Sequence, residues 1–97
     1  MQSDVKKIKE ALRDVIDFEL GLDVVSLGFI RKIEVGDDEV KIEMILTSPM
    51  CPMASMLTRQ VQERASEVVD KPVEVNLGRE MWKPEMMEPD ARESLGI

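Results

Sequence analysis

The sequence predicts an α+β fold, a two-layer sandwich in the order α-β-β-α-β with a short C-terminal helix and a three-stranded mixed sheet. Two amphipathic helical patterns, residues 4–17 and 52–69, occur together with three alternating segments, residues 29–35, 40–46 and 73–77. Because a helix connects the second strand to the third, these two strands should run parallel. Both helices are expected to cover the one apolar face of the sheet.

The first helical pattern carries charged residues on one face, and its apolar members are Val5, Ile8, Leu12, Val15 and Ile16. Ser3 and Asp4 are both suitable N-caps, because their side-chain oxygens accept hydrogen bonds from the first free backbone N–H groups. We expect the helix to end near Asp17, since Gly21 interrupts the pattern and residues 17–28 have no sustained period.

The next two segments alternate with the period of a β-strand. In the first, Phe29, Arg31, Ile33 and Val35 alternate with Ile30, Lys32 and Glu34, and in the second, Val40, Ile42, Met44 and Leu46 alternate with Lys41, Glu43 and Ile45. The short turn Gly36-Asp37-Asp38 between them predicts a hairpin whose strands each have one apolar face and one largely polar face.

The second helical pattern has an apolar stripe made of Met53, Met56, Leu57, Val61, Ala65, Val68 and Val69. Asp70-Lys71-Pro72 ends it, because the residue before a proline is unfavourable in a helix. Val73, Val75 and Leu77 then alternate with two polar residues, so residues 73–77 are predicted to form the third strand, which ends at Gly78.

The C-terminal stretch, residues 79–97, predicts an irregular segment followed by a short helix. Met87, Ala91 and Leu95 lie at successive fourth positions, with Pro89 suited to a helix start and Gly96 to a C-cap. Such a tail packs over the edge of a domain or contributes to a ligand or partner surface. Trp82 is the residue that distinguishes the two interpretations.

Methionine is frequent, with eight residues, and it both fills irregular cores and forms adaptable binding surfaces. Core filling is the expected role of Met44, Met53 and Met56, which fall on the apolar faces described above. A second group, Met81, Met86 and Met87, lies close in sequence to the only tryptophan, Trp82.

Composition predicts one domain over residues 1–97, with residues 79–97 packing on it as a tail. A formal charge of −7 repels nucleic acid and anionic membranes, and no apolar run approaches the length of a membrane span, about 18 residues. One cysteine forms no internal disulfide and no signal-peptide pattern is present, so the expected location is the cytoplasm.

Cys51 follows the second strand and precedes Pro52, a residue favoured at the first position of a helix, so Cys51 is the predicted N-cap. Free backbone N–H groups and the helix dipole there favour the thiolate, the form that attacks electrophiles and ligates metals. The alternative is a buried cysteine that acts as a small hydrophobe. Because the chain has no histidine, Cys-His and Ser-His catalysis are excluded, and self-contained hydrolase chemistry is disfavoured.

Four motifs occur in order along nearly the whole chain: Asp17-Phe18-Glu19-Leu20-Gly21, Leu27-Gly28, Thr47-Ser48-Pro49-Met50-Cys51-Pro52, and Trp82-Lys83-Pro84-Glu85-Met86-Met87 with a closing Ala91-Arg92 and Leu95-Gly96. Together they resemble the small domain associated with iron-sulfur protein maturation. Its members include SufT-like factors, the small subunit of the eukaryotic cytosolic iron-sulfur targeting complex and PaaD-like subunits. The resemblance implies the same α+β sandwich that the periodicities predict.

The resemblance also implies a site and a role. It places the functional residues, which include candidate ligands, at Asp17, Glu19, Thr47, Ser48 and Cys51. One thiolate is far fewer than the four that usually hold a cluster, so Cys51 would bind iron or an iron-sulfur cluster transiently, with no permanent cofactor. The remaining ligands would come from a second copy of the chain or from a partner.

The preferred hypothesis is therefore an adaptor or carrier in iron-sulfur cluster assembly or delivery. Its expected partners are a P-loop carrier ATPase or scaffold and client apoproteins, and the docking surface is expected at Trp82, Met86 and Met87. One alternative is a PaaD-like accessory subunit of a multicomponent oxygenase. An RNA-binding module of the KH type is disfavoured because the Gly-x-x-Gly clamp and a basic groove are missing, and a stand-alone thiol enzyme is disfavoured by the lack of histidine.

Overall fold

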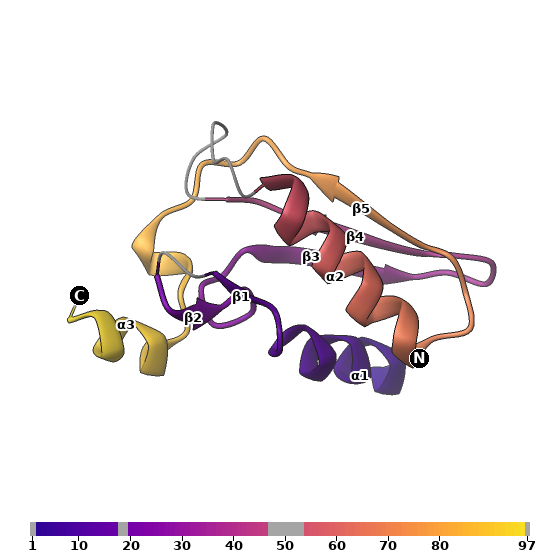
Figure 1. Cartoon of the computed structure of the whole chain (residues 1–97), viewed down its shortest axis with the longest axis horizontal. Coiled ribbons are helices and arrows are strands. Elements are labelled where there is room, and N and C mark those ends of the chain that lie inside the picture. The colour runs from indigo at the N-terminus through magenta and orange to yellow at the C-terminus, as the bar shows by residue number, and fades with distance from the viewer. Residues whose placement is uncertain (1, 18–19, 47–53, 97) are drawn as a thin grey trace.

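The computed structural model of the chain describes residues 2–17, 20–46 and 54–96. The elements, in order, are α1 (Gln2–Leu12), β1 (Ile16–Asp17), β2 (Leu22–Asp23), β3 (Ile30–Val35), β4 (Val40–Met44), α2 (Ala54–Val68), β5 (Val73–Leu77), the 3₁₀ helix η1 (Pro84–Met86) and α3 (Pro89–Leu95) (Figure 1). The main order is the predicted α-β-β-α-β with a short C-terminal helix, so the predicted α+β class is confirmed.

The main sheet has three strands in the order β3-β4-β5. The β3-β4 hairpin is antiparallel and the β4-β5 pair is parallel, as expected from the α2 crossover. Helix α1 contacts α2 and β3, and α2 contacts β5, so both helices cover the same face of the sheet (Figure 1). The sheet and the two helices that cover it thus form two layers.

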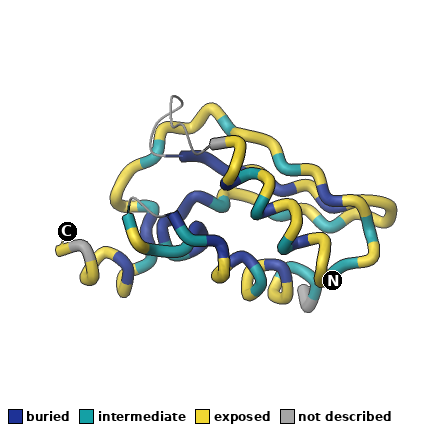
Figure 2. Tube along the Cα trace, viewed as in Figure 1, coloured by how far each residue is buried: buried dark blue, intermediate teal, exposed yellow. Residues whose placement is uncertain are grey.

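The core lies between these two layers. In β4 the buried residues Val40, Ile42 and Met44 alternate with exposed Lys41 and Glu43, as the sequence predicts. Figure 2 shows the buried positions on the facing sides of the helices and the sheet. The fully buried large side chains are Phe29, Ile8, Leu12, Leu27, Ile42, Met44, Ile45, Leu57, Val15, Val24, Val40 and Val61.

Helix α1 ends at Leu12, about one turn earlier than the apolar spacing predicts. The chain turns after Leu12, and β1 then pairs with β2 in a two-residue ladder that joins Ile16 to Asp23 and Asp17 to Leu22. The spacing alone is misleading here because the turn still directs Val15 into the core, where it is only 2% exposed. A helix and a tight turn thus satisfy the same pattern.

Strand β3 contains an irregularity that the predicted alternation lacks. The register with β4 shifts between Ile30 and Lys32, which is the signature of a β-bulge. As a result Arg31 and Lys32 are both exposed, while Phe29, just before the strand, is fully buried. The bulge places two charged side chains in water and keeps the aromatic ring in the core.

The later elements agree with the predictions within a few residues. Strand β5 has the predicted bounds, and α2 covers most of the predicted 52–69 range. Met44 is buried as predicted, but Met56 is 42% exposed, so the prediction of a core role for Met56 was wrong. Met53 lies outside the described residues. Within the part of the chain that the structure covers, no helix is long and apolar enough to cross a membrane.

The predicted C-terminal helix is present as α3. It runs from Pro89 to Leu95 and is capped by Gly96, whose φ of 75° is the left-handed conformation typical of a C-cap glycine. The Gly96 N–H donates to carbonyl groups of the last turn, at Arg92 and Glu93. Ala91 is buried, so α3 packs on the rest of the chain through one side.

Candidate functional site

The residues predicted to form the site divide into two groups. Glu19, Thr47, Ser48 and Cys51 lie outside the described residues. The predicted helix start, with Cys51 as the N-cap and Pro52 as the first helical residue, lies outside them too. Asp17, Trp82, Met86 and Met87 are described, and each has a defined environment. The structure therefore shows the framework on either side of residues 47–53.

The chain enters and leaves residues 47–53 through well-packed elements. Before that segment, the Ile45 N–H donates to the Phe29 carbonyl at 2.8 Å, and the Met44 carbonyl accepts from the Gly78 N–H at 2.8 Å. Ile45 is 2% exposed, and after the segment Leu57 of α2 is fully buried. The end of β4 and the beginning of α2 are thus both anchored in the core.

Asp17 is a buried carboxylate at the end of β1. It is 3% exposed, and it is the one charged side chain classed as buried among the described residues. Its Oδ1 accepts a hydrogen bond from the Leu20 N–H at 3.3 Å, and its carbonyl accepts one from the Gly21 N–H at 2.7 Å. Gly21 has φ = 72°, a backbone conformation that residues with a side chain rarely adopt. Asp17 therefore stabilises the tight turn between β1 and β2.

Trp82 attaches the C-terminal segment to the loop that precedes β3. Its indole N–H donates to the Leu27 carbonyl at 2.7 Å. Its ring meets the Phe29 ring edge to face, with centroids 6.1 Å apart and planes at 83°. The side chain is half-buried, so part of the ring still faces solvent.

The methionines near Trp82 differ in their surroundings. Met87 is 4% exposed and belongs to the core, so the prediction that it contributes to a docking surface was wrong. Met86 is half-buried, and Met81 is 77% exposed. The four-residue spacing of Met87 and Ala91 already indicated a buried side, which tertiary packing turns toward the core.

Gly28 lies directly against the C-terminal segment. A Cβ atom on Gly28 would come within 2.2 Å of the Met86 carbonyl oxygen, far closer than van der Waals contact permits. Its φ of 77° is also left-handed. Only glycine allows the two backbones to approach this closely, which explains the Leu27-Gly28 motif in physical terms.

A polar cluster that the sequence did not predict holds the same two segments together. Arg13 donates to both carboxylate oxygens of Glu88, at 3.2 Å and 3.1 Å. Asp23 accepts from the Ser26 hydroxyl at 2.6 Å and lies 3.8 Å from Arg13. The Glu88 N–H donates to the Ser26 carbonyl at 2.9 Å. No local pattern could reveal this cluster, because Arg13 and Glu88 are 75 positions apart.

The Arg13–Glu88 pair makes stability depend on pH. The hydrogen bond from Arg13 holds the pKa of Glu88 below the usual 4.5, although the partial burial of Glu88 opposes this shift. A depressed folded-state pKa contributes stability above the unfolded-state value, and that contribution is lost as pH falls through the folded-state value. At about pH 7, we expect Glu88→Gln to lower the free energy of unfolding by about 0.5 kcal/mol, because water screens this half-exposed pair.

Denaturant unfolding at a series of pH values measures this effect. The gap between wild type and Glu88→Gln should narrow as pH is lowered below about 4.5. Glu85→Gln is the control, since Glu85 is exposed and no ion pair joins it to another described residue. A gap for Glu88→Gln that stays constant into strong acid would contradict the assignment.

The described residues contain no group of three or more histidine, cysteine, aspartate or glutamate side chains placed to hold a metal ion. Asp17 is the described member of the predicted ligand set, and its carboxylate binds the turn. The described part of the site thus consists of a strand end, a helix start and a turn that holds a buried carboxylate.

Comparison with known proteins matches nearly all of the chain. Residues 6–77 match the family profile described as "Iron-sulfur cluster assembly protein". The Fe-S protein maturation auxiliary factor SufT of Staphylococcus aureus is 38% identical over 89 residues, covering 86% of this chain and 98% of that protein. The Fe-S protein maturation auxiliary factor YitW of Bacillus subtilis is 33% identical over 98 residues, covering 95% of this chain and 93% of that protein.

The fold has a close counterpart among solved structures. A crystal structure of a domain of unknown function from Bacillus anthracis superimposes with a TM-score of 0.90 at 33% identity. The superposition covers 99% of this chain and 94% of that one.

Proposed function

The chain belongs to the iron-sulfur cluster assembly protein family, and on that premise we propose that it is a maturation factor that helps to assemble iron-sulfur clusters or deliver them to client proteins. The observation that carries this proposal is the similarity to maturation auxiliary factors over nearly their whole length. An adaptor or carrier role agrees with a chain that has one cysteine and no histidine.

Cys51 is the proposed point of contact with the cargo. A thiolate is the usual protein ligand of iron-sulfur clusters, and Cys51 is the one thiol in the chain. Since a cluster usually takes four thiolates, the partner or a second copy of the chain would complete the ligand set during transfer. The cluster, or iron alone, is then a cargo that is held briefly, with Glu19, Thr47 and Ser48 as further contacts.

Asp17 has a supporting role in this proposal. Its carboxylate accepts a hydrogen bond from the Leu20 N–H, and its carbonyl accepts one from the Gly21 N–H, so it stabilises the backbone at Leu20 and Gly21, which follow Glu19 in the sequence. A buried carboxylate already engaged in a turn is better suited to positioning than to direct ligation. Asp17→Asn tests this, since the amide oxygen keeps the acceptor while the charge is lost.

The proposed partners are the proteins that make and receive clusters, namely a P-loop carrier ATPase or scaffold and the client apoproteins. Trp82 and Met86, both half-buried, are the proposed contacts on the C-terminal segment. We propose that the protein meets these partners in the cytoplasm, which agrees with a lone cysteine that can form no internal disulfide.

The proposal predicts that Cys51→Ser abolishes client maturation. In a strain that lacks the native gene, we expect the variant to restore the activity of iron-sulfur client enzymes no better than an empty vector does. Serine keeps the size of the side chain and removes the soft sulfur ligand. Ser94→Ala, an exposed change in α3, is the control and should complement fully. Full complementation by a folded Cys51→Ser protein would remove Cys51 from the mechanism.

Anaerobic reconstitution tests the cargo directly. Wild-type protein treated with iron and sulfide should develop sulfur-to-iron charge-transfer absorption and a mass increase, while Cys51→Ser should develop neither. Native mass measurement reports at the same time whether one chain or two hold the cargo. Equal cluster uptake by both proteins would rule out Cys51 as the ligand, and no uptake by either would favour an adaptor that does not bind the cluster.

A further inference from the structure

Strand β5 is an edge strand, and its hydrogen bonds show which of its backbone groups are free to pair. The Val40 N–H donates to the Pro72 carbonyl at 2.9 Å, and the Gly78 N–H donates to the Met44 carbonyl at 2.8 Å. These two bonds lie at the two ends of the parallel β4-β5 ladder. Backbone groups alternate in direction along a strand. The N–H and carbonyl groups of the even-numbered residues of β5 therefore point toward β4.

The odd-numbered residues Val73, Val75 and Leu77 therefore direct their N–H and carbonyl groups to the outer edge. One contact supports this directly: the Gln62 side-chain amide donates to the Val73 carbonyl at 3.3 Å. In the part of the chain that the structure describes, no side chain forms a hydrogen bond with the backbone of Val75 or Leu77. An exposed edge of this kind is a template for a further strand.

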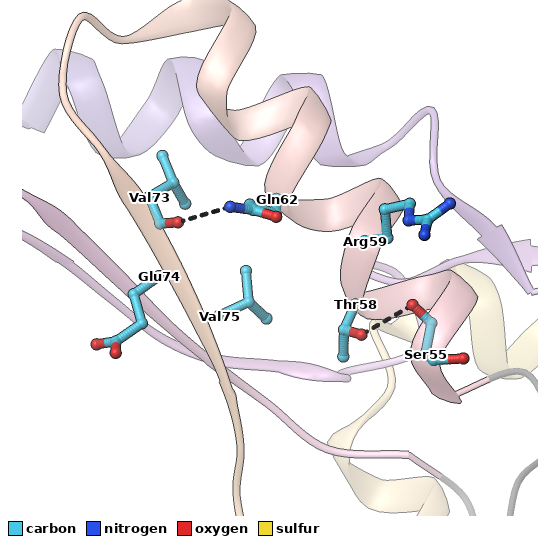
Figure 3. Close-up of a pocket in the computed structure, with 7 residues that line it drawn as sticks. All are labelled: Ser55, Thr58, Arg59, Gln62, Val73, Glu74 and Val75. Carbon is cyan, nitrogen blue, oxygen red and sulfur yellow. Dashed lines mark hydrogen bonds between the residues drawn. The ribbon is translucent and has the colours of Figure 1, made fainter.

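A groove of about 430 Å³ runs along this edge between β5 and α2. Its lining consists of Ser55, Thr58, Arg59, Gln62, Val73, Glu74 and Val75 (Figure 3). Val75 and Gln62 project into the space between the strand and the helix, and Glu74 points away from it (Figure 3). The floor is apolar, the helix wall is polar, and the strand presents free backbone groups.

Arg59 provides a charge at the rim of the groove. It lines the groove from α2, and its side chain is exposed at the outer rim (Figure 3). Among residues 2–17, 20–46 and 54–96, it forms no ion pair. Arg64, further along the same helix, is paired with Asp14 and Glu67. The guanidinium of Arg59 is thus available for a carboxylate of the occupant.

We propose that this groove binds an extended segment of a partner protein, which adds to β5 as a fourth strand and places an acidic side chain against Arg59. The inference does not depend on cluster binding. A second copy of this chain fits less well, because the groove-facing residues of its β5, Val73, Val75 and Leu77, carry no carboxylate for Arg59.

Nuclear magnetic resonance titration with a designed probe tests the proposal. The probe is the blocked peptide acetyl-Thr-Val-Glu-Val-Thr-Val-amide, added to the labelled full-length chain. We expect saturable shifts of the Val75 and Leu77 amides and of residues 55–62 in α2. The same peptide with alternate backbone nitrogens methylated should not bind, because methylation removes the donors that strand addition needs. Equal binding of the methylated peptide, or no shift in β5 with either peptide, would overturn the proposal.

Charge reversal tests the role of Arg59. Wild-type protein should bind the glutamate peptide about fivefold more tightly than the matching lysine peptide, as expected for an exposed ion pair. Arg59→Glu should reverse this preference, whereas Lys7→Glu, an equal change of charge on α1, should leave it intact. An unchanged preference in Arg59→Glu would remove the acidic residue from the proposed occupant.

Val75→Pro tests the edge itself. Proline removes the outward N–H group that the β4 ladder does not use, so edge proline is compatible with the folded sheet. We expect the glutamate peptide and the lysine peptide both to lose binding to this variant. If Val75→Pro fails to fold, the methylated peptide, which needs no change in the protein, still decides the question.

Discussion

Gly28→Ala should lower the free energy of unfolding by about 3 kcal/mol. Two costs combine at this position. Alanine in the left-handed region costs about 1 kcal/mol, and the new methyl group would lie 2.2 Å from the Met86 carbonyl oxygen. Backbone, not a flexible side chain, fills that space, so the C-terminal segment must move away.

Chemical denaturation measures the loss, and Trp82 provides a local signal, because it is the only tryptophan. Displacement of the segment should shift the Trp82 emission to longer wavelength in the folded state. Gly21→Ala is the matched control: its φ is 72°, but a Cβ there meets nothing within 4 Å, so only the backbone cost of about 1 kcal/mol applies. If the two variants lose the same stability, the close approach to Met86 is not a constraint.

Phe29→Ala is expected to cost about 4 kcal/mol, in the range found for buried phenylalanines truncated to alanine. Phe29 is fully buried and lies where three parts of the fold meet. Its N–H donates to the Val24 carbonyl, its carbonyl accepts from the Ile45 N–H, and its ring contacts Trp82. Truncation leaves a cavity under the C-terminal segment and removes the aromatic pair as well.

Thermal and denaturant unfolding both measure this variant, and a loss of this size is a large share of the stability of a typical domain. Met81→Ala serves as the comparison, because the Met81 side chain is 77% exposed and its removal should change stability by less than about 0.5 kcal/mol. A cost for Phe29→Ala below about 1 kcal/mol would mean that Phe29 does not connect the sheet to the C-terminal segment.

Local patterns predict those elements whose limits are themselves local. Strand β5 has its predicted bounds because Pro72 and Gly78 flank a short alternating segment. Helix α3 follows from the spacing of Met87 and Ala91 together with the C-cap at Gly96. In each case, the residues that begin and end the element lie within a few positions of it.

Predictions failed where distant contacts decide the outcome. The end of α1 depends on the pairing of Ile16 with Asp23, which competes with another helical turn. The β3 bulge depends on its register with β4. Met56 lies on the predicted apolar stripe, yet its side chain is 42% exposed. Periodicity gives a direction around a helix, but it does not say how far the neighbouring layer extends.

The candidate site shows the same division. Sequence alone located the Cys51 motif between a strand and a helix, and the framework has this order, with β4 ending at Met44 and α2 beginning at Ala54. The role of Cys51 stays a prediction. The use of Asp17 in a tight turn, and the burial of Met87, could not be read from the motifs, because each depends on which backbone groups the folded chain brings nearby.

The sequence by itself determined the class of fold, the order of the main elements and the family resemblance, because these depend on spacing and on motifs of a few residues. Only the tertiary structure decided that Arg13 holds Glu88, that Gly28 admits the Met86 backbone, and that β5 leaves one edge open beside α2. These features join residues far apart in the chain, so their energies arise only when packing brings the partners within contact distance.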